Sequence, residues 1–214
     1  MIICDKLSKR FGENFALRSV SFSAEGKIAV FGYNGAGKST LAKILAGILK
    51  PTSGRLEIFG HNPNRSADLR RKIGVVTHNP MLYKELTVKE NLEFFAKLYK
   101  VKNWERVVQS LNLEDKLNSR VSELSRGFTQ RVAIARALLP KPKVLIFDEV
   151  LSGLDLESKE AVLSLMQEFS GILVFSTHNF EDAEFCDNFL VLDSGRLIYF
   201  GESYEKAIHS LSGR

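Results

Sequence analysis

Residues 32–39 have the composition of a loop that binds phosphate groups. They read Gly-Tyr-Asn-Gly-Ala-Gly-Lys-Ser and fit the pattern Gly-x-x-x-x-Gly-Lys-Ser/Thr. Glycines let backbone N–H groups turn inward around phosphates, and a helix after them adds its positive N-terminal end. The Lys38 ammonium would neutralise the phosphates, and the Ser39 hydroxyl would bind Mg²⁺. The alternative is a glycine-rich turn that only precedes a buried helix. The residues predicted to contact the nucleotide are Gly32, Asn34, Gly35, Ala36, Gly37, Lys38, Ser39 and Thr40.

Two adjacent carboxylates form a second candidate site. Asp148 and Glu149 follow the apolar run Val144-Leu145-Ile146-Phe147, which is typical of a buried strand. Asp148 at the end of that strand would hold Mg²⁺, and Glu149 would lie next to the attacking water. The alternative is that both acids are solvated loop charges.

A third segment has the features of an anion-binding helix start. Leu124-Ser125-Arg126-Gly127-Phe128 precedes an apolar stripe formed by Val132, Ala135 and Leu139. Ser125 and Gly127 would then lie at a helix N-terminus, where free backbone N–H groups favour an anion. Taken alone, a serine before a helix is more often a plain N-cap.

Strands and helices predicted around these residues indicate an α/β fold. Short β-like runs at 2–7, 20–22 and 28–31 open the chain. Leu41, Ile44, Leu45 and Ile48 form one helical stripe before Pro51. A strand is expected at 56–59, and further strands at 143–147 and 172–175 are continuous apolar runs, as in buried parallel sheets. A hairpin at 188–192 and 197–200 ends the series.

Residues 79–137 show no convincing strand. Thr87-Val88-Lys89-Glu90 has the form of a capping box, which predicts a helix start. The economical interpretation is a helical insertion into an α/β core. We therefore expect a single domain over 1–214, with a core at 1–77 and 138–214 and a helical subdomain at about 78–137.

The composition limits the partners and the cellular compartment that we expect for the chain. The chain has 214 residues, 44% of them hydrophobic, and a net charge of +5 from 30 basic and 25 acidic residues. The basic excess could favour nucleic acid or an anionic membrane face, but no run reaches the five or six like charges typical of a tail. Cys4 and Cys186 lack zinc-site spacing and favour a reducing compartment. No apolar stretch approaches the ~18 residues of a membrane span, so we expect a cytosolic chain with no anchor of its own.

The motifs in order resemble those of the nucleotide-binding subunit of ATP-binding cassette (ABC) transporters, from about Leu7 to Gly201. The phosphate loop comes first, a Q-loop region near His78 follows, and the signature lies at 124–128. The acidic strand end at 144–149, a D-loop at 152–155 and the switch segment Ser176-Thr177-His178 complete the series. The resemblance implies a P-loop NTPase core with a mainly parallel sheet, an N-terminal antiparallel β subdomain, and ATP and Mg²⁺ as ligands.

The same resemblance implies roles for single residues. Adenine would stack on Phe11, whose alternative is core packing. Glu149 would be the general base, with Lys38 on the phosphates, and His178 would contact the γ-phosphate and the catalytic water; a capped surface histidine is its alternative. Asp155 would bridge two protomers, a role that could coexist with capping the following helix.

Four positions depart from the usual family pattern, and one of them is Val150, which stands where proline commonly follows the two acids. His78 replaces the Q-loop glutamine and, with Asn79, could ligate metal-bound water. Arg126 replaces a glycine of the signature, where it either hinders close backbone approach or adds a cation near the opposing phosphate, and Phe128 replaces its glutamine. Ser-Arg-Gly together with His78-Asn79 and the stretch 91–99 resembles the haem-exporter branch used in cytochrome c maturation.

The resemblance also implies partners. A second copy would form an ATP sandwich, with each ATP between the phosphate loop of one chain and Ser125, Arg126 and Gly127 of the other. A separate membrane-spanning permease would dock on a surface that includes Met81, Leu82, Tyr83 and Phe94, which could equally be core residues. The chain would then lie in the cytoplasm, peripheral on the inner face of the membrane. No nucleic acid is expected, and a DNA-associated ATPase or a regulatory module without hydrolysis are the alternatives.

Overall fold

The computed structural model describes residues 1–212 of the chain and contains two sheets. The smaller sheet is antiparallel, with the order β2-β1-β4. Its strands are β1 (Ile2–Phe11), β2 (Asn14–Ala24) and β4 (Ser53–Ile58). The expectation of an N-terminal antiparallel sheet is therefore confirmed, and its strands are longer than the apolar runs alone indicated.

The larger sheet has the order β5-β6-β7-β3-β8-β9. Its strands are β3 (Lys27–Phe31), β5 (Ile73–Val76), β6 (Val144–Asp148), β7 (Ile172–Ser176), β8 (Asn188–Asp193) and β9 (Arg196–Gly201). The first five strands in this order pair in parallel, and β9 pairs antiparallel with β8. The carboxyl ends of β3, β6 and β7 therefore lie along one edge, where open α/β sheets bind ligands.

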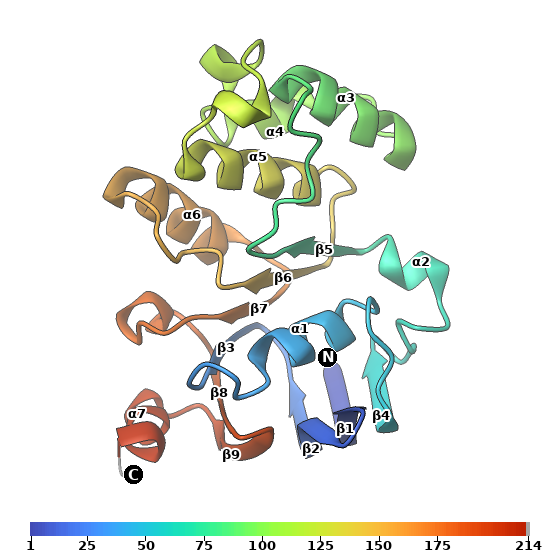
Figure 1. Cartoon of the computed structure of the whole chain (residues 1–214), viewed down its shortest axis with the longest axis vertical. Coiled ribbons are helices and arrows are strands. Elements are labelled where there is room, and N and C mark those ends of the chain that lie inside the picture. The colour runs from blue at the N-terminus through green and yellow to red at the C-terminus, as the bar shows by residue number, and fades with distance from the viewer. Residues whose placement is uncertain (213–214) are drawn as a thin grey trace.

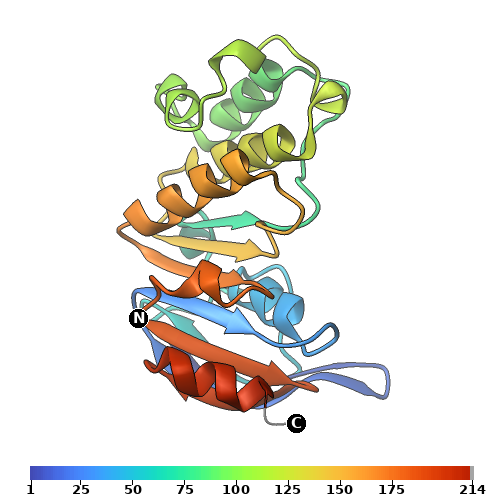
Figure 2. The same cartoon turned by 90° about the vertical axis from the view of Figure 1, so that its left-hand side faces the viewer.

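Both faces of the larger sheet are covered, which explains its unbroken apolar strands. Ala29 and Phe31 of β3 pack in a core with residues of α5 (Arg126–Leu138) and α6 (Leu156–Glu168). Ile28 and Val30 point to the other face and pack with α1 (Lys38–Leu45) and the small sheet. Figure 2 shows the same division, with α6 and α1 on opposite sides of the strands.

The segment 79–137 is helical, and no strand lies between these residues, as predicted. Its helices are α3 (Val88–Tyr99), α4 (Glu105–Gln109), the 3₁₀ turns η1 (Glu114–Lys116) and η2 (Val121–Glu123), and α5, which ends one residue beyond the segment. Thr87 Oγ1 accepts from the Glu90 backbone N–H at 3.1 Å, and Glu90 Oε2 accepts from the Thr87 N–H at 2.8 Å, which confirms the capping box. Figure 1 shows these helices at the end of the molecule away from the small sheet.

Some expectations were wrong or incomplete. Helix α1 ends at Leu45, so Ile48 does not continue its buried stripe and is 57% exposed. The sequence did not indicate β5, the short helix α2 (Ala67–Arg70), the 3₁₀ turn η3 (Glu181–Ala183) or α7 (Tyr204–Ser212). Among the described residues, no helix is both long and apolar enough to cross a bilayer.

Candidate functional site

The loop between β3 and α1 requires glycine at particular positions. Gly37 has φ 106°, and a Cβ there would lie 2.5 Å from the carbonyl oxygen of Ala16. Gly32 has φ 149°, and its Cβ would overlap the carbonyl oxygen of Leu192. Side chains at either position would force the loop outward. The two glycines therefore allow the loop to pass close to the Ala16 and Leu192 carbonyl groups before α1 begins.

A cavity of about 440 Å³ opens at this loop. It is lined by Ala16, Asn34, Gly35, Ala36, Gly37, Lys38, Ser39, Thr40, His78 and Glu149. The structure thus brings the predicted Q-loop position His78 and the predicted base Glu149 to the phosphate loop, although they follow different strands. His78 is exposed and comes two residues after the end of β5.

Lys38 is 5% exposed, and protein acceptors surround its ammonium. Its Nζ donates to the Gly32 carbonyl at 2.8 Å and to the Tyr33 carbonyl at 3.3 Å. Glu149 Oε1 lies 3.4 Å from the same Nζ. A buried cation needs such compensation. A phosphate that reaches this lysine has to compete with acceptors that belong to the loop and to the predicted base.

Asp148, at the end of β6, is 1% exposed. Its Oδ1 accepts from Ser39 Oγ at 3.0 Å and from Ser176 Oγ at 2.9 Å. Its Oδ2 is buried and has no hydrogen-bond partner among the described residues. A buried carboxylate oxygen without a donor is unfavourable unless a cation lies near it. The Asp148 carboxylate and the Ser39 hydroxyl offer oxygen atoms, which are the ligands that Mg²⁺ prefers.

Glu149 has a backbone conformation that is rare for a side-chain-bearing residue, with φ 55°. Its N–H donates to Ser176 Oγ at 2.9 Å, which holds the turn after β6 in place. Its Oε1 lies 2.9 Å from His178 Nε2. The two side chains are 32% and 46% exposed, so water can reach both. A carboxylate and an imidazole in contact at a solvent-open cavity can orient a water molecule and accept its proton.

The signature turn lies against α6 of the same chain. Ser125 caps α5 by accepting from the Phe128 N–H at 3.3 Å, so the plain N-cap interpretation of Ser125 is correct at least for its hydroxyl. A Cβ on Gly127 would overlap Ser158 Oγ and would lie 2.9 Å from Asp155 Oδ2. A side chain at position 127 would therefore force the Ser158 and Asp155 side chains away from the signature turn.

Asp155 serves as the N-cap of α6. Its Oδ1 accepts from the Ser158 N–H at 2.9 Å, and Ser158 Oγ donates to its Oδ2 at 3.0 Å. These hydrogen bonds, the backbone one first, lower the pKa of Asp155. Arg126 lies beside the same segment, because a Cβ on Gly153 would be 2.7 Å from its Nη1. The signature and the D-loop segment 152–155 therefore form one packed unit.

This unit does not reach the phosphate loop of its own chain. Ser125, Arg126, Gly127 and Asp155 are absent from the residues that line the 440 Å³ cavity. Figures 1 and 2 both show β6 and β7 between α5 and α1. The signature turn before α5 and the phosphate loop before α1 therefore lie apart in this chain, with β6 and β7 between their helices.

Phe11, the last residue of β1, is 52% exposed, so the alternative that it packs in the core is wrong. Lys9 Nζ lies 5.0 Å from the centre of its ring. Its exposed aromatic face is available to a flat ligand, although Phe11 does not line the 440 Å³ cavity.

Sequence reasoning missed two residues of the site. Ala16 lines the cavity, and its carbonyl oxygen leaves no room for a Cβ on Gly37. This contact is made by the backbone, so the side-chain pattern of the sequence does not indicate it. Ser176 connects Asp148 with the Glu149 backbone. Its position in the Ser-Thr-His segment was a signal, but its contact depends on the parallel register that pairs Asp148 with Ser176.

Comparison with known sequences places these features in a family. Residues 17–152 match the family model described as ABC transporter. The probable sulfate/thiosulfate import ATP-binding protein CysA of Chlorella vulgaris is 34% identical over 97% of this chain and 94% of its own length. The ABC transporter ATP-binding protein NatA of Bacillus subtilis is also 34% identical, over 94% of this chain and 89% of its own length.

Solved structures agree with the sequence comparison. A structure described as an ATP-binding subunit of an ABC transporter superposes with a TM-score of 0.84 at 31% identity, over all of this chain and 93% of that one. A dimeric ATP-binding cassette in a post-hydrolysis state with ADP and Pi has a TM-score of 0.83 at 29% identity, over 94% of this chain and 98% of that one.

Proposed function

Because the chain belongs to the ABC transporter family, we propose that two copies of it close on two Mg-ATP molecules and thereby drive a separate membrane-spanning partner. It is an ATP-binding and ATP-hydrolysing subunit of an ABC transporter. The residue roles, the ATP sandwich and the permease contact are the parts that we add as proposals.

One observation supports an arrangement in which each ATP lies between two copies of the chain. The signature turn at Ser125 and Gly127 is packed on α6, away from the cavity at the phosphate loop. An ATP in that cavity can therefore meet a signature only if a second chain supplies it. Two copies related by a two-fold axis satisfy both sites at once, since each chain offers one loop and one signature. The dimeric relative with ADP and Pi supports this arrangement.

Within each site, we assign the phosphates to the backbone N–H groups of the loop and to Lys38. Glu149 accepts a proton from the attacking water, and His178, which lies 2.9 Å from it, orients that carboxylate and contacts the γ-phosphate. Phe11 offers its exposed ring to adenine, a contact worth about 1–3 kcal/mol. Arg126 and Asp155 face the partner copy.

Mg²⁺ fits the residues present, since Ser39 and Asp148 supply oxygen ligands and Asp148 Oδ2 lacks a donor. The ion would neutralise charge that develops on the phosphates. His78 lines the same cavity and would hold a water of the ion's outer shell. The chain's own residues then position the water and take its proton.

An exposed apolar surface supports a contact with the permease. Met81, Tyr83 and Phe94 are 43%, 50% and 43% exposed, whereas Leu82 packs against the core. The rings of Tyr83 and Phe94 lie 5.2 Å apart in an edge arrangement. We call Met81, Tyr83, Phe94 and Leu98 the docking patch. Exposed apolar groups of this kind are typical of protein interfaces, and a helix of the partner would lie across them.

Through this partner, the chain would lie on the inner face of the membrane. The division into a core and a helical subdomain at about 78–137 stays a proposal, supported by the separate position of α3, α4 and α5 (Figure 1). The transported substrate, the direction of transport and the haem-exporter branch stay predictions. No specific observation favours the regulatory or DNA-associated alternatives.

The test is the variant Glu149→Gln. It should retain ATP-dependent pairing, because the amide keeps the shape of the side chain, and it should lose at least about a hundredfold in phosphate release, because it cannot accept a proton. Size-exclusion chromatography with Mg-ATP measures pairing, and a phosphate assay measures turnover. A wild-type chain that stays monomeric in Mg-ATP, or a variant with unchanged phosphate release, would contradict the proposal.

A further inference from the structure

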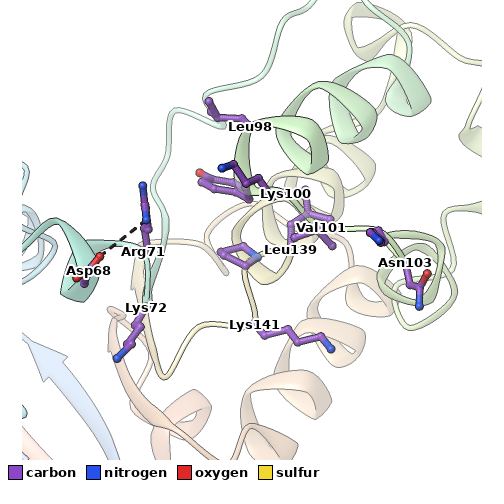
Figure 3. A pocket seen from close by; sticks show the side chains of 12 residues that line it. Asp68, Arg71, Lys72, Leu98, Lys100, Val101, Asn103, Leu139 and Lys141 are labelled. Carbon is purple, nitrogen blue, oxygen red and sulfur yellow. Dashed lines mark ion pairs between the residues drawn. The ribbon is translucent and has the colours of Figure 1, made fainter.

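A cavity of about 230 Å³ adjoins the proposed base Glu149 and the switch residue His178. Residues of α6 and of the segment after β7 also line it, among them Lys159, Thr177, Asn179 and Asp182. A larger cavity, of about 740 Å³, lies beside the C-terminal end of α3 (Figure 3) and shares no lining residue with this one or with the phosphate-loop cavity. The smaller cavity is therefore the one that brings further charged groups to the catalytic pair.

Lys159 and Asp182 form an ion pair in the lining of this cavity. Lys159 Nζ lies 2.6 Å from Asp182 Oδ1, and the two side chains are 28% and 7% exposed. Within residues 1–212, Lys159 is the cation that lies within 4.0 Å of this carboxylate. A buried carboxylate is costly without an opposite charge, so Asp182 depends on Lys159.

Asp182 also contacts the residues on both sides of His178. Its Oδ2 accepts from Thr177 Oγ1 at 3.5 Å, and its Oδ1 accepts from Asn179 Nδ2 at 3.4 Å. The Asn179 N–H donates to Thr177 Oγ1 at 3.1 Å, across the bend at His178. The ion pair is the short contact of this group, and two longer hydrogen bonds converge on the same carboxylate. The bend that presents His178 is therefore tied to α6 through Asp182 and Lys159.

His178 needs this support because its side chain has few contacts of its own. The ring is 46% exposed, and within the described residues its polar contact is the one from Nε2 to Glu149 Oε1, at 2.9 Å. The Glu149 side chain is itself 32% exposed. One contact between two partly exposed side chains does not select a single rotamer, so the backbone of the bend has to place the ring.

We propose that Lys159 and Asp182 are positioning residues for ATP hydrolysis, because their ion pair holds the bend at which His178 meets Glu149. The inference rests on the proposed function, from which it takes the roles of His178 and Glu149. Lys159 and Asp182 do not line the phosphate-loop cavity, so they act through His178 and not on the nucleotide.

NMR of the imidazole groups tests the placement of His178 without nucleotide. The chain has four histidines, so the His178 signal can be assigned from its loss in His178→Ala. Lys159→Met should shift this signal more than those of the other three histidines, because methionine keeps the apolar stem and removes the charge. Lys159→Arg should leave it near its wild-type position, since a guanidinium also pairs with a carboxylate. An unchanged His178 signal in Lys159→Met would overturn the proposal.

Steady-state ATPase assays test the consequence for hydrolysis. Lys159→Met should lower kcat about tenfold and change the KM for ATP less than about twofold, because it misplaces His178 without touching the phosphate loop. Lys159→Arg should keep kcat within about twofold of the wild type. The matched control is Lys89→Met, which removes an exposed ion pair with Glu93 on α3, 4.0 Å apart, and should change neither constant. Wild-type kcat in Lys159→Met would contradict the inference.

A second variant separates loss of position from loss of stability. Lys159→Met/Asp182→Asn leaves no unpaired buried charge, so it should melt closer to the wild type than Lys159→Met does. It still lacks the connection between α6 and the bend, so kcat should stay low and the His178 signal should stay displaced. A double variant with wild-type kcat would show that Lys159→Met acts only through an uncompensated charge, and the proposal would fail.

The same measurements distinguish this inference from the proposed function. Wild-type kcat in His178→Ala would refute the role that we assign to His178. A slow His178→Ala together with a Lys159→Met variant of wild-type kcat would refute only the inference about the ion pair.

Discussion

Replacing Ser176 with alanine should disturb catalysis without touching the phosphate loop. Ser176 Oγ donates to Asp148 Oδ1 and accepts from the Glu149 N–H, both at 2.9 Å. Alanine removes both contacts and leaves the N–H of Glu149, a residue with φ 55°, without its acceptor. Asp148 would keep only the donor Ser39.

The expected magnitude follows from these two contacts. A net hydrogen bond contributes about 0.5–1.5 kcal/mol, and one to a charged group about 1.5–3 kcal/mol. Their sum indicates a loss of about 2–4 kcal/mol of stability for Ser176→Ala. For a chain of this size, each kcal/mol lowers the melting temperature by about 2–4 °C. We therefore expect a decrease of about 5–15 °C.

The catalytic effect should appear in kcat and not in KM. Glu149 would lose the bond that fixes its backbone, so its carboxylate would lose alignment, and kcat should fall about tenfold to a hundredfold. The KM for ATP should change little, because Ser176 does not line the loop cavity. Steady-state ATPase assays and thermal melts measure both.

The variant Ser110→Ala is the control, because it removes a serine hydroxyl far from the proposed catalytic residues. Ser110 Oγ donates to the Val107 carbonyl on an exposed helix, so Ser110→Ala should leave kcat unchanged and the melting temperature within about 2 °C. If Ser176→Ala kept the wild-type kcat and had the same melting temperature as Ser110→Ala, the argument that Ser176 positions Glu149 would be refuted.

Two further predictions concern the signature and the D-loop. Gly127→Ala should cost about 1–3 kcal/mol in a thermal melt and weaken ATP-dependent pairing, because its Cβ would overlap Ser158 Oγ. Wild-type pairing would contradict the close packing. The pKa of folded Asp155 is lowered by hydrogen bonds from Ser158, so the stability they provide is present above the unfolded pKa of about 3.9 and is lost as pH falls through the folded pKa. The melting temperature of the wild type should therefore decrease below about pH 4 more than that of Asp155→Asn, and parallel curves would contradict this assignment.

Much of the fold was predictable because its signals are local. The capping box at Thr87 and Glu90 and the apolar run of β6 depend on neighbouring residues, so sequence spacing is enough to find them. The phosphate loop was found from the local spacing of its glycines, lysine and serine, although Gly32 and Gly37 are needed because of contacts with the distant residues Leu192 and Ala16. Strand β5 was missed because it has only four residues, one of them Gly74, and its stability comes from pairing with β6.

The parts of the site that sequence could not predict depend on contacts between distant segments. Ser176 meets Asp148 only because β6 and β7 pair in one particular register. Gly127 requires its lack of a side chain because Ser158, 31 positions later, lies against it. Ile48 was misassigned since periodicity alone does not show where a helix ends.

The contacts of Lys38 affect how readily the products of hydrolysis leave the site. An ammonium has three donors, and Gly32, Tyr33 and Glu149 offer three acceptors within 3.4 Å. When products depart, the lysine returns to partners of the protein itself and is never stranded in a buried position without an opposite charge. Part of the attraction for a departing phosphate is cancelled in this way. We therefore expect these protein acceptors to ease the release of products from Lys38.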